Sequence, residues 1–303
     1  MSKEKFESGS FYSVIPNTDV NYNGNSPYTN IDYNDIGHEK IILDLPNKLG
    51  SFDEIFGYKF SQKNDLNNII DFLGKNKNDE LQKNFFNYYL CNGSFEWMDG
   101  RLLYYFMSLF KPNKIIELGS GDSTLLMHNA KKKLNLNTKI ICIDKNPHPI
   151  IKKLSTENHI LLFEEELVNI ELKMFESLNK NDILFIDSSH TIKMNSDVMF
   201  YFSKIFPILK PGVNIQIHDI FLPYEYPLGW INEGIYWNEQ YMLYIFLQNT
   251  QKFRILFSNN YAYYKFKEKL HEIQKYYYEN KMIIEREHTN EPFAGGSIWL
   301  RVT

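Results

Sequence analysis

The sequence predicts a doubly wound α/β domain, in which helices cover both faces of a mainly parallel sheet. Three observations support this fold class. A short apolar strand at Ile115 and Ile116 runs into a glycine-rich turn, short apolar segments then alternate with segments of helical periodicity, and acidic residues follow most of the apolar segments. Strands that are apolar throughout are typical of parallel sheets covered on both faces.

Composition and charge limit the classes of protein that fit. With 303 residues, of which 43% are hydrophobic, the chain can bury one large core and at most a small appendage. A net charge of -4 argues against a nucleic-acid surface. Two cysteines, Cys91 and Cys142, are too few for a disulfide framework and indicate a reducing compartment. No run approaches the roughly 18 apolar residues that span a bilayer, and the N-terminus lacks an apolar signal segment, so we expect a soluble, cytoplasmic protein.

Residues 1–95 are predicted to form a loop and helical extension that covers the site. Residues 1–60 show no sustained period, and we expect an exposed loop there, with aromatic contacts to the main domain or a substrate as the alternative. Helical spacing of apolar residues predicts two covering helices at 62–73 and 80–90. A third, strongly amphipathic helix follows Asp99 and ends at Lys111-Pro112, where the chain enters the first strand.

Residues 96–303 are predicted to form the main domain. After the first strand, further strands are expected at 139–143, 159–163, 182–186, 213–217, 253–257 and 296–301. Helices are expected at 123–133, 147–154, 171–178, 196–206 and 237–248. An aromatic-rich segment at 259–291 separates the last two strands, and we expect a helical insertion there that packs on the sheet or caps the site.

The turn after the first strand has the features of a nucleotide-binding loop. Gly119 and Gly121 lack a Cβ atom, so the backbone can turn sharply and a bulky ligand can lie against it. Asp144 lies 27 residues beyond Glu117, at a place where a carboxylate can accept both hydroxyls of a ribose. These features suit either a dinucleotide or S-adenosylmethionine.

Two residues around the turn favour S-adenosylmethionine. Thr124 stands where a dinucleotide fingerprint carries its third glycine, and Glu117 stands immediately before the turn. A carboxylate there can engage the amino group of a methionine moiety, but it would compete with a pyrophosphate for the helix N-terminus. A nicotinamide-dependent oxidoreductase on a similar sheet is therefore the disfavoured alternative.

Polar residues gather at the predicted carboxyl ends of the strands, which is where ligands bind in such sheets. The five ends carry acids, and carboxylates beside a buried sheet must be paired or engaged. We interpret this set as functional. Its members are Glu117–Gly121, Asp144, Glu164–Asn169, Asp187–His190 and His218–Asp219.

Several segments resemble the motifs of class I S-adenosylmethionine-dependent methyltransferases. They are ELGSGDST, Asp144, DILFIDSSH, LKPGV and HDIFLPYEYP. The resemblance is closest to a bacterial family that also has an FYS-x-IP segment near the N-terminus, a WNEQY segment and a closing GGSIWLR. It covers nearly the whole chain, from Phe11 to Arg301.

The resemblance implies a Rossmann-like, seven-stranded sheet whose last strand is antiparallel, and S-adenosylmethionine as cofactor. The predicted cofactor contacts are Glu117, Gly119, Ser120, Gly121, Ser123, Asp144, Asn169, Asp187 and Ser188. One departure follows the third strand, where the family pattern has a Gln-Asp pair near the adenine and this chain has Val168-Asn169. The contact to the adenine amino group therefore lacks its usual residues.

The chemistry implied is direct displacement at a sulfonium methyl group, for which an enzyme aligns an acceptor oxygen and removes a proton. His190 is the first candidate for the base, with Asp187 and Asp219 as further catalytic candidates. In the alternative interpretation, His190 is a structural residue that fixes the Asp187 loop by a hydrogen bond. Glu239 can either reach the acceptor or pair locally.

We expect O-methylation of a small polar acceptor, such as a sugar or a saccharide-bearing metabolite. Acidic and aromatic residues around the predicted mouth suit hydroxyl binding and ring stacking. They are Tyr224, Glu225, Tyr226, Trp230 and Trp237. The alternative is a non-catalytic module that binds the cofactor without methyl transfer. The sequence leaves the exact acceptor and the oligomeric state undefined.

Asp187, His218 and Asp219 form a candidate metal site beside the cofactor methyl group. Asp187 ends the fourth strand and the other two end the fifth, so strands about 4.8 Å apart bring the side chains toward one point. A cation is one way to keep two close carboxylates ionised. This arrangement resembles that of some sugar O-methyltransferases, in which an aspartate and an acidic pair bind magnesium. In this chain His218 stands in place of the first acid of that pair. Its nitrogen suits manganese, iron or zinc better than it suits magnesium. In the alternative, His218 donates a hydrogen bond to Asp187, Asp219 contacts substrate, and no metal binds.

Overall fold

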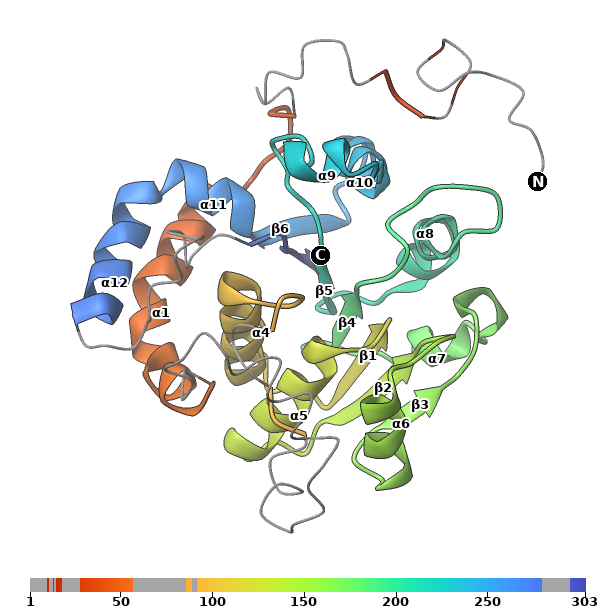
Figure 1. Ribbon diagram of the computed structural model, residues 1–303, viewed down its shortest axis with the longest axis horizontal. Helices are drawn as coiled ribbons and strands as arrows, with labels where there is room; N and C mark the ends of the chain where they lie inside the picture. The colour runs from red at the N-terminus through yellow and green to blue at the C-terminus, as the bar shows by residue number, and fades with distance from the viewer. Residues whose placement is uncertain are drawn as a thin grey trace.

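A seven-stranded sheet forms the centre of the described part of the protein, as a computed structural model shows (Figure 1). The structure describes residues 28–56, 86–88, 92–279 and 295–303, together with 10, 13 and 15–17. The strands are β1 (Lys114–Leu118), β2 (Lys139–Ile143), β3 (Leu161–Phe163), β4 (Ile183–Ile186), β5 (Asn214–Ile217), β6 (Phe253–Ser258) and β7 (Ile298–Val302). All seven predicted strands are present, within a few residues of their expected bounds.

The order of the strands is β3-β2-β1-β4-β5-β7-β6. Strands β1 to β5 pair in parallel, whereas β7 runs antiparallel to both β5 and β6. The predicted Rossmann-like sheet with an antiparallel last strand is thus confirmed. The strand order reverses between β1 and β4, and a crevice for ligands forms outside the carboxyl ends of strands at such a point.

Helices cover both faces of the sheet, and each face has its own apolar core. The helices and single turns beyond the first helix are α4 (Trp97–Phe110), α5 (Asp122–Lys133), α6 (Pro149–Thr156), η1 (Leu167–Asn169), α7 (Lys173–Glu176), α8 (Asp197–Phe200), η2 (Tyr201–Ile205), η3 (Phe206–Ile208), α9 (Leu228–Asn232), α10 (Glu239–Gln248), α11 (Asn259–Lys265) and α12 (Lys267–Glu279). The single helix expected at 196–206 is instead the series α8, η2 and η3, which ends at the turn that contains Pro207.

A helix occupies much of the N-terminal region for which the sequence predicted an exposed loop. This helix is α1 (Asp35–Phe56), and it lies beside α11 and α12 (Figure 1). Ile42, Leu45 and Leu49 are fully buried and join the core that contains α4. The loop prediction was wrong here because Ile42, Leu45 and Leu49 form only a short apolar pattern, and Pro46 inside the helix argues against a helix when the sequence is considered alone.

His38 anchors α1 to the sheet. Its Nε2 accepts a hydrogen bond from the Ser258 backbone N–H at 2.8 Å, and its Nδ1 lies 3.1 Å from the Asn34 carbonyl oxygen. Burial lowers the pKa of this imidazole, in keeping with a neutral ring that donates from one nitrogen and accepts at the other.

Some predicted helices lie outside the described residues. These include all of 62–73 and most of 80–90, of which residues 86–88 are described and are not helical. The insertion expected at 259–291 begins with α11 and α12, as predicted, while residues 280–294 are outside the described part.

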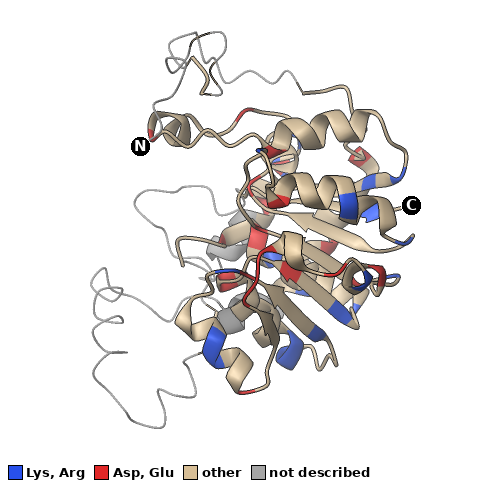
Figure 2. Ribbon diagram, turned by 90° about the vertical axis from the view of Figure 1, so that its right-hand side faces the viewer, with Lys and Arg blue, Asp and Glu red and all other residues tan. Residues whose placement is uncertain are grey.

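Charged residues of both signs are spread over the outer elements, and several acidic residues lie near the middle of the molecule (Figure 2). Within the part of the chain that the structure describes, no helix combines the length and the apolar character needed to cross a bilayer.

Candidate active site

The turn between β1 and α5 brings the ends of three strands together. Gly119 has a φ of 90°, and a Cβ atom there would lie 1.9 Å from the Asp187 carbonyl oxygen. Its N–H donates to the Ile143 carbonyl at 2.9 Å. Only glycine permits this backbone contact between the ends of β1 and β4. Gly121 differs, because a Cβ there would meet nothing within 4 Å, so the chain itself leaves room beside the turn.

Glu117 is fully buried beneath the turn, with a side chain bonded by three donors of the chain. Its Oε1 accepts from the Ser123 hydroxyl at 2.5 Å, and its Oε2 accepts from the Thr124 hydroxyl at 2.6 Å and the Cys142 thiol at 3.2 Å. Burial raises the pKa of this carboxyl to about 7, against the lowering effect of these bonds. Two predicted cofactor contacts, Glu117 and Ser123, therefore bind each other, and Cys142 has a polar role that its apolar surroundings concealed.

Replacement of Glu117 by glutamine is expected to change how stability depends on pH. The folded-state pKa of about 7 lies above the ordinary value of 4.5, so folded protein binds more protons than unfolded protein between these values, and stability falls as pH rises through them. At 1.36 kcal/mol per pKa unit, the loss from pH 5 to pH 8 is about 2–3 kcal/mol. Urea unfolding at both pH values should show this loss in the wild type relative to Glu117→Gln. The exposed control Glu165→Gln should behave as the wild type, and parallel pH profiles for all three proteins would contradict the assignment.

Asp144 and Ser120 lie together on the other side of the turn. The Ser120 hydroxyl donates to Asp144 Oδ2 at 2.5 Å, and the Asn146 N–H donates to Asp144 Oδ1 at 2.8 Å. Asp144 is half-buried, and its bond to Ser120 holds its carboxylate at the glycine turn, beside the residue that precedes Gly121. Asn169 is exposed at the end of η1.

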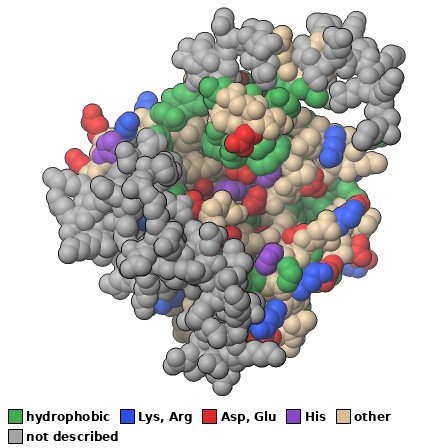
Figure 3. Space-filling view, viewed as in Figure 1, with side chains coloured by type: hydrophobic (Ala, Val, Ile, Leu, Met, Phe, Trp, Pro, Cys, Tyr) green, Lys and Arg blue, Asp and Glu red, His purple; other side chains and the backbone are tan. Residues whose placement is uncertain are grey.

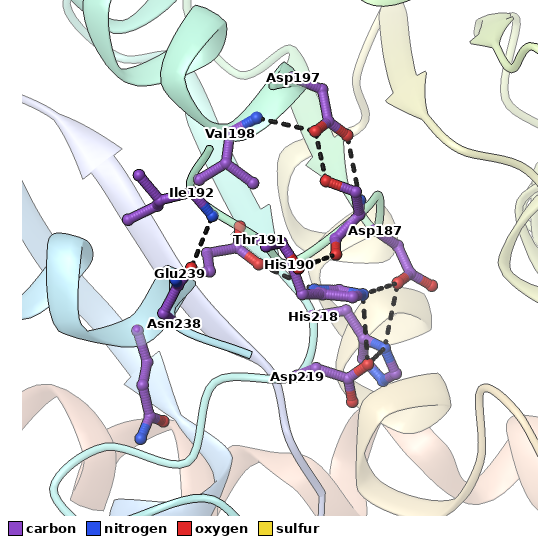
Figure 4. A network of polar contacts seen from close by, with 12 residues as sticks. Asp187, His190, Thr191, Ile192, Asp197, Val198, His218, Asp219, Asn238 and Glu239 are labelled. Carbon is purple, nitrogen blue, oxygen red and sulfur yellow. Dashed lines mark hydrogen bonds and ion pairs between the residues drawn. The ribbon is translucent and has the colours of Figure 1, made fainter. Parts of the chain in front are cut away.

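Two carboxylates and two imidazoles meet at the ends of β4 and β5 (Figure 4). Ligand atoms of Asp187, His218 and Asp219 all lie within 4.8 Å of one another. His218 Nδ1 is 3.5 Å from Asp187 Oδ1 and 3.5 Å from Asp219 Oδ2, yet it makes no hydrogen bond and is buried. Asp219 has a φ of 57°, a conformation that costs energy in a non-glycine residue and is frequent at functional sites.

His190 reaches the same carboxylates from the loop after β4. Its Nε2 lies 3.2 Å from Asp187 Oδ1 and 3.4 Å from Asp219 Oδ2, while its Nδ1 lies 2.8 Å from Glu239 Oε2. Burial lowers the pKa of this imidazole, but the bonds to Asp187 and Glu239 outweigh burial and raise the pKa to about 10. Burial likewise opposes ionisation of Asp187, yet the charge of His218, together with the charge and the bond of His190, holds the pKa of that carboxyl well below its usual range. The cluster is therefore an ion-pair network.

Glu239 connects this network to the helices behind it. The carboxylate is fully buried, and its second oxygen, Oε1, accepts a short hydrogen bond from the Tyr201 hydroxyl. Of the two roles open to Glu239, the structure has the local pairing, with His190. Tyr201 was not identified from the sequence, because it lies in a segment where aromatic residues fit an apolar helix face, and its hydroxyl gave no separate signal.

Asp99 is the second residue of the site that the sequence did not identify. It was assigned only to the start of a helix, but its Oδ2 lies 3.5 Å from His218 Nε2. The residue is 6% exposed, and no spacing in the sequence relates it to a residue 119 positions later.

Aromatic side chains border the cluster. The Trp237 ring lies 4.2 Å from the His190 ring, and Trp230 packs edge-on against Trp237 at 4.9 Å. Figure 3 shows histidine and acidic side chains within a hollow near the centre of this face. Glu225 is bonded within the chain, since its oxygens accept from Tyr28 at 2.6 Å and Tyr241 at 2.7 Å.

Residues 116–220 match a protein family described as a methyltransferase domain. An uncharacterized protein of Archaeoglobus fulgidus is 26% identical over 192 residues, which cover 59% of this chain and 76% of that protein.

Solved structures with a similar arrangement are far more distant in sequence. An O-methyltransferase from Bacillus cereus in complex with SAH is 11% identical with a TM-score of 0.45, and the match covers 86% of this chain and 100% of that one. A CmcI structure with Mg and SAM is 17% identical with a TM-score of 0.34, and the match covers 53% of this chain and 66% of that one. This chain therefore spans only about two thirds of CmcI. The family match, by contrast, includes β1 to β5 and with them the glycine turn and the carboxylate–histidine cluster.

Proposed function

We propose that this chain is a class I S-adenosylmethionine-dependent methyltransferase and that it transfers the methyl group to a hydroxyl oxygen of a small polar acceptor. The observation that carries the proposal is the position of the Asp187, His190 and Asp219 cluster. Its backbone touches Gly119 in the glycine turn, so a donor in that turn and an acceptor at the cluster would be neighbours.

The residues around the turn fit S-adenosylmethionine. The room beside Gly121 admits a ligand against the backbone, and Asp144 with Ser120 supplies a carboxylate and a hydroxyl suited to the two hydroxyls of a ribose. When bound, the cofactor supplies an electrophilic methyl group. The protein then has to align the acceptor oxygen and take its proton.

We assign the proton acceptor to His190. In the metal-free protein its Nε2 holds a proton, because its pKa is raised to about 10 by Asp187 and Glu239 against the effect of burial. Engagement of Asp187 and Asp219 by a cation would weaken the interactions that hold this proton and free Nε2 to accept one from the hydroxyl. Glu239 stays on Nδ1 and fixes the orientation of the ring.

A divalent cation fits the site formed by Asp187, His218 and Asp219. His218 Nδ1 is a buried atom without a hydrogen bond, and it faces two carboxylate oxygens at equal distances of 3.5 Å. One nitrogen and two carboxylate donors suit manganese, iron or zinc better than magnesium. When bound, the ion would supply a positive charge that acidifies the acceptor hydroxyl.

We further propose that the acceptor is a saccharide or a similarly hydroxylated small molecule. Trp230 and Trp237 offer ring surfaces beside the carboxylates. The rings suit the apolar faces of a sugar, and the carboxylates suit its hydroxyls.

The test is release of S-adenosylhomocysteine and transfer of labelled methyl across a panel of sugars and other alcohols. Calorimetry with S-adenosylmethionine and NAD separates the enzyme classes: tight NAD binding without S-adenosylmethionine binding would refute the proposal, and cofactor binding without transfer to any acceptor would favour a binding module.

Replacement of Asp144 by alanine is expected to weaken S-adenosylmethionine binding by about 1.5–3 kcal/mol, which is typical of hydrogen bonds to a charged acceptor. Stability should hardly change, because Asp144 is half-buried and bonded only to neighbouring polar groups. Calorimetry measures the affinity, with Glu165→Ala as a control at an exposed acid. Equal affinities for Asp144→Ala and the wild type would show that this residue does not contact the ribose.

A further inference from the structure

We infer that Asp99 is a positioning residue that turns His218 into a metal ligand, an inference that rests on the proposed metal centre. In this arrangement Asp99 receives the proton on His218 Nε2, and the lone pair on Nδ1 faces Asp187 and Asp219. A carboxylate behind a ligating histidine fixes the ring and its tautomer and raises the basicity of the ligand atom.

The two nitrogens of His218 face opposite sets of carboxylates. Nε2 lies 3.5 Å from Asp99 Oδ2, while Nδ1 lies 3.5 Å from oxygens of Asp187 and Asp219. The Phe95 ring packs against the imidazole with a centroid distance of 5.1 Å, so the plane of the ring is fixed by packing as well. When a cation replaces the proton on Nδ1, the one proton that stays on the ring is the one on Nε2, which faces Asp99.

Asp99 is itself held in place from two later parts of the chain. Its Oδ1 accepts from the Asn259 side-chain amide at 2.5 Å, and its Oδ2 accepts from the Gly296 N–H at 3.1 Å. These donors come from α11 and from the segment that enters β7, and Asp99 comes from the first turn of α4. Two later parts of the chain thus orient a side chain that α4 carries. This fixes the position of the Asp99 carboxylate more closely than the capping of a helix requires.

The two glycines of the GGSIWLR segment are accounted for by the same group. A Cβ on Gly295 would lie 2.9 Å from both carboxylate oxygens of Asp99. A Cβ on Gly296 would lie 3.2 Å from the Phe221 ring and 3.4 Å from Asp219 Cα. Any larger residue at these positions would push on Asp99 or on Asp219.

The test is cation affinity in Asp99→Asn, with Glu96→Gln as the matched control. Both changes convert an acid to its amide at the start of α4, and the Glu96 carboxylate accepts a hydrogen bond from the Gly93 N–H at 2.6 Å, in the loop before the helix. We expect Asp99→Asn to bind Mn²⁺ about tenfold to a hundredfold more weakly than the wild type, by calorimetry or electron paramagnetic resonance. The visible spectrum of bound Co²⁺ should change as well, whereas S-adenosylmethionine affinity without metal should not.

Each outcome decides between specific alternatives. Unchanged Mn²⁺ affinity and an unchanged Co²⁺ spectrum in Asp99→Asn would overturn the inference and leave the metal centre standing. Absence of metal binding by the wild type would refute both the role of Asp99 and the metal centre. The proposed methyltransferase function would still be tested separately, by measurements of methyl transfer and of cofactor binding. If Asp99→Asn does not fold, Gly295→Ala decides the matter. Its added methyl group would lie 2.6 Å from the Asn259 amide nitrogen and 2.9 Å from both Asp99 carboxylate oxygens, so it displaces the carboxylate together with its amide partner without removing the charge, and it should weaken Mn²⁺ binding in the same way.

Discussion

Exhaustive chelation is expected to lower methyl transfer by about a thousandfold, and add-back of one divalent ion to restore it. The reason is the arrangement of His218 Nδ1, Asp187 and Asp219, whose donor atoms lie within 4.8 Å of one another with a buried nitrogen that makes no hydrogen bond. A metal that stabilises developing charge contributes several kcal/mol, and about 4 kcal/mol corresponds to a factor of a thousand. Magnesium, manganese, iron and zinc should be added one at a time, with manganese, iron or zinc expected to be more effective than magnesium.

Asp219→Asn supplies the control for this experiment. The variant keeps the shape of the side chain but loses a charged ligand, so the ion that restores the chelated wild type should fail to restore the variant at the same concentration. Cofactor affinity, measured without metal, should stay unchanged and thereby show that the fold is intact. Full activity of the chelated wild-type enzyme would eliminate the metal centre and leave His218 as a partner of Asp187.

Replacement of Glu239 by glutamine is expected to have the second-largest effect. Removal of one partner from a buried ion pair costs about 3–5 kcal/mol, because the other charge stays buried without compensation. In the metal-free protein the His190 pKa of about 10 exceeds its ordinary value of 6.5, so its contribution to stability is fully present below pH 6.5 and is lost as pH rises through 10. The wild type should therefore lose stability between pH 7 and pH 10, and Glu239→Gln should lose much less over that range. Turnover with metal should fall by about a hundredfold, because His190 loses the group that orients it.

Tyr201→Phe is the matched control for Glu239→Gln. It removes the donor to Glu239 Oε1 but leaves the contact between Glu239 and His190, so a loss of about 1–2 kcal/mol is expected, with the pH dependence of the wild type retained. Urea unfolding at pH 7 and pH 9.5 measures both variants. If Tyr201→Phe flattened the pH profile as much as Glu239→Gln, the assignment of the effect to the His190 ion pair would be wrong.

The parts of the site that could be predicted from sequence are those that follow from parallel strands. Asp187 and the pair His218 and Asp219 end neighbouring strands, and the carboxyl ends of parallel strands meet at one edge, so their approach needed no knowledge of side-chain packing. The glycine turn was equally accessible from the sequence, because glycine can adopt the positive φ that Gly119 has in this turn, whereas bulkier residues rarely do.

The remaining parts depend on contacts between distant segments. Tyr201 and Asp99 take part in the site only because η2 packs on α10 and α4 packs beside β5, and neither residue has a sequence pattern that distinguishes it from an ordinary helix residue. The helix α1 was missed for a related reason: its stability comes from burial of Ile42 and Leu45 against the main domain rather than from its own helix propensity.

The contact between Gly119 and the Asp187 carbonyl places the proposed S-adenosylmethionine site and the proposed cation site on one piece of backbone. No room for even a Cβ atom separates the turn from the end of β4, so we expect a ligand that shifts the turn to shift the end of β4 as well. We therefore expect the two binding equilibria to be thermodynamically linked. By reciprocity, the factor by which bound S-adenosylmethionine changes the affinity for the cation equals the factor by which the cation changes the affinity for S-adenosylmethionine. Such linkage can favour the enzyme with both S-adenosylmethionine and the cation bound over the enzyme with only one of them bound, and it requires no domain movement.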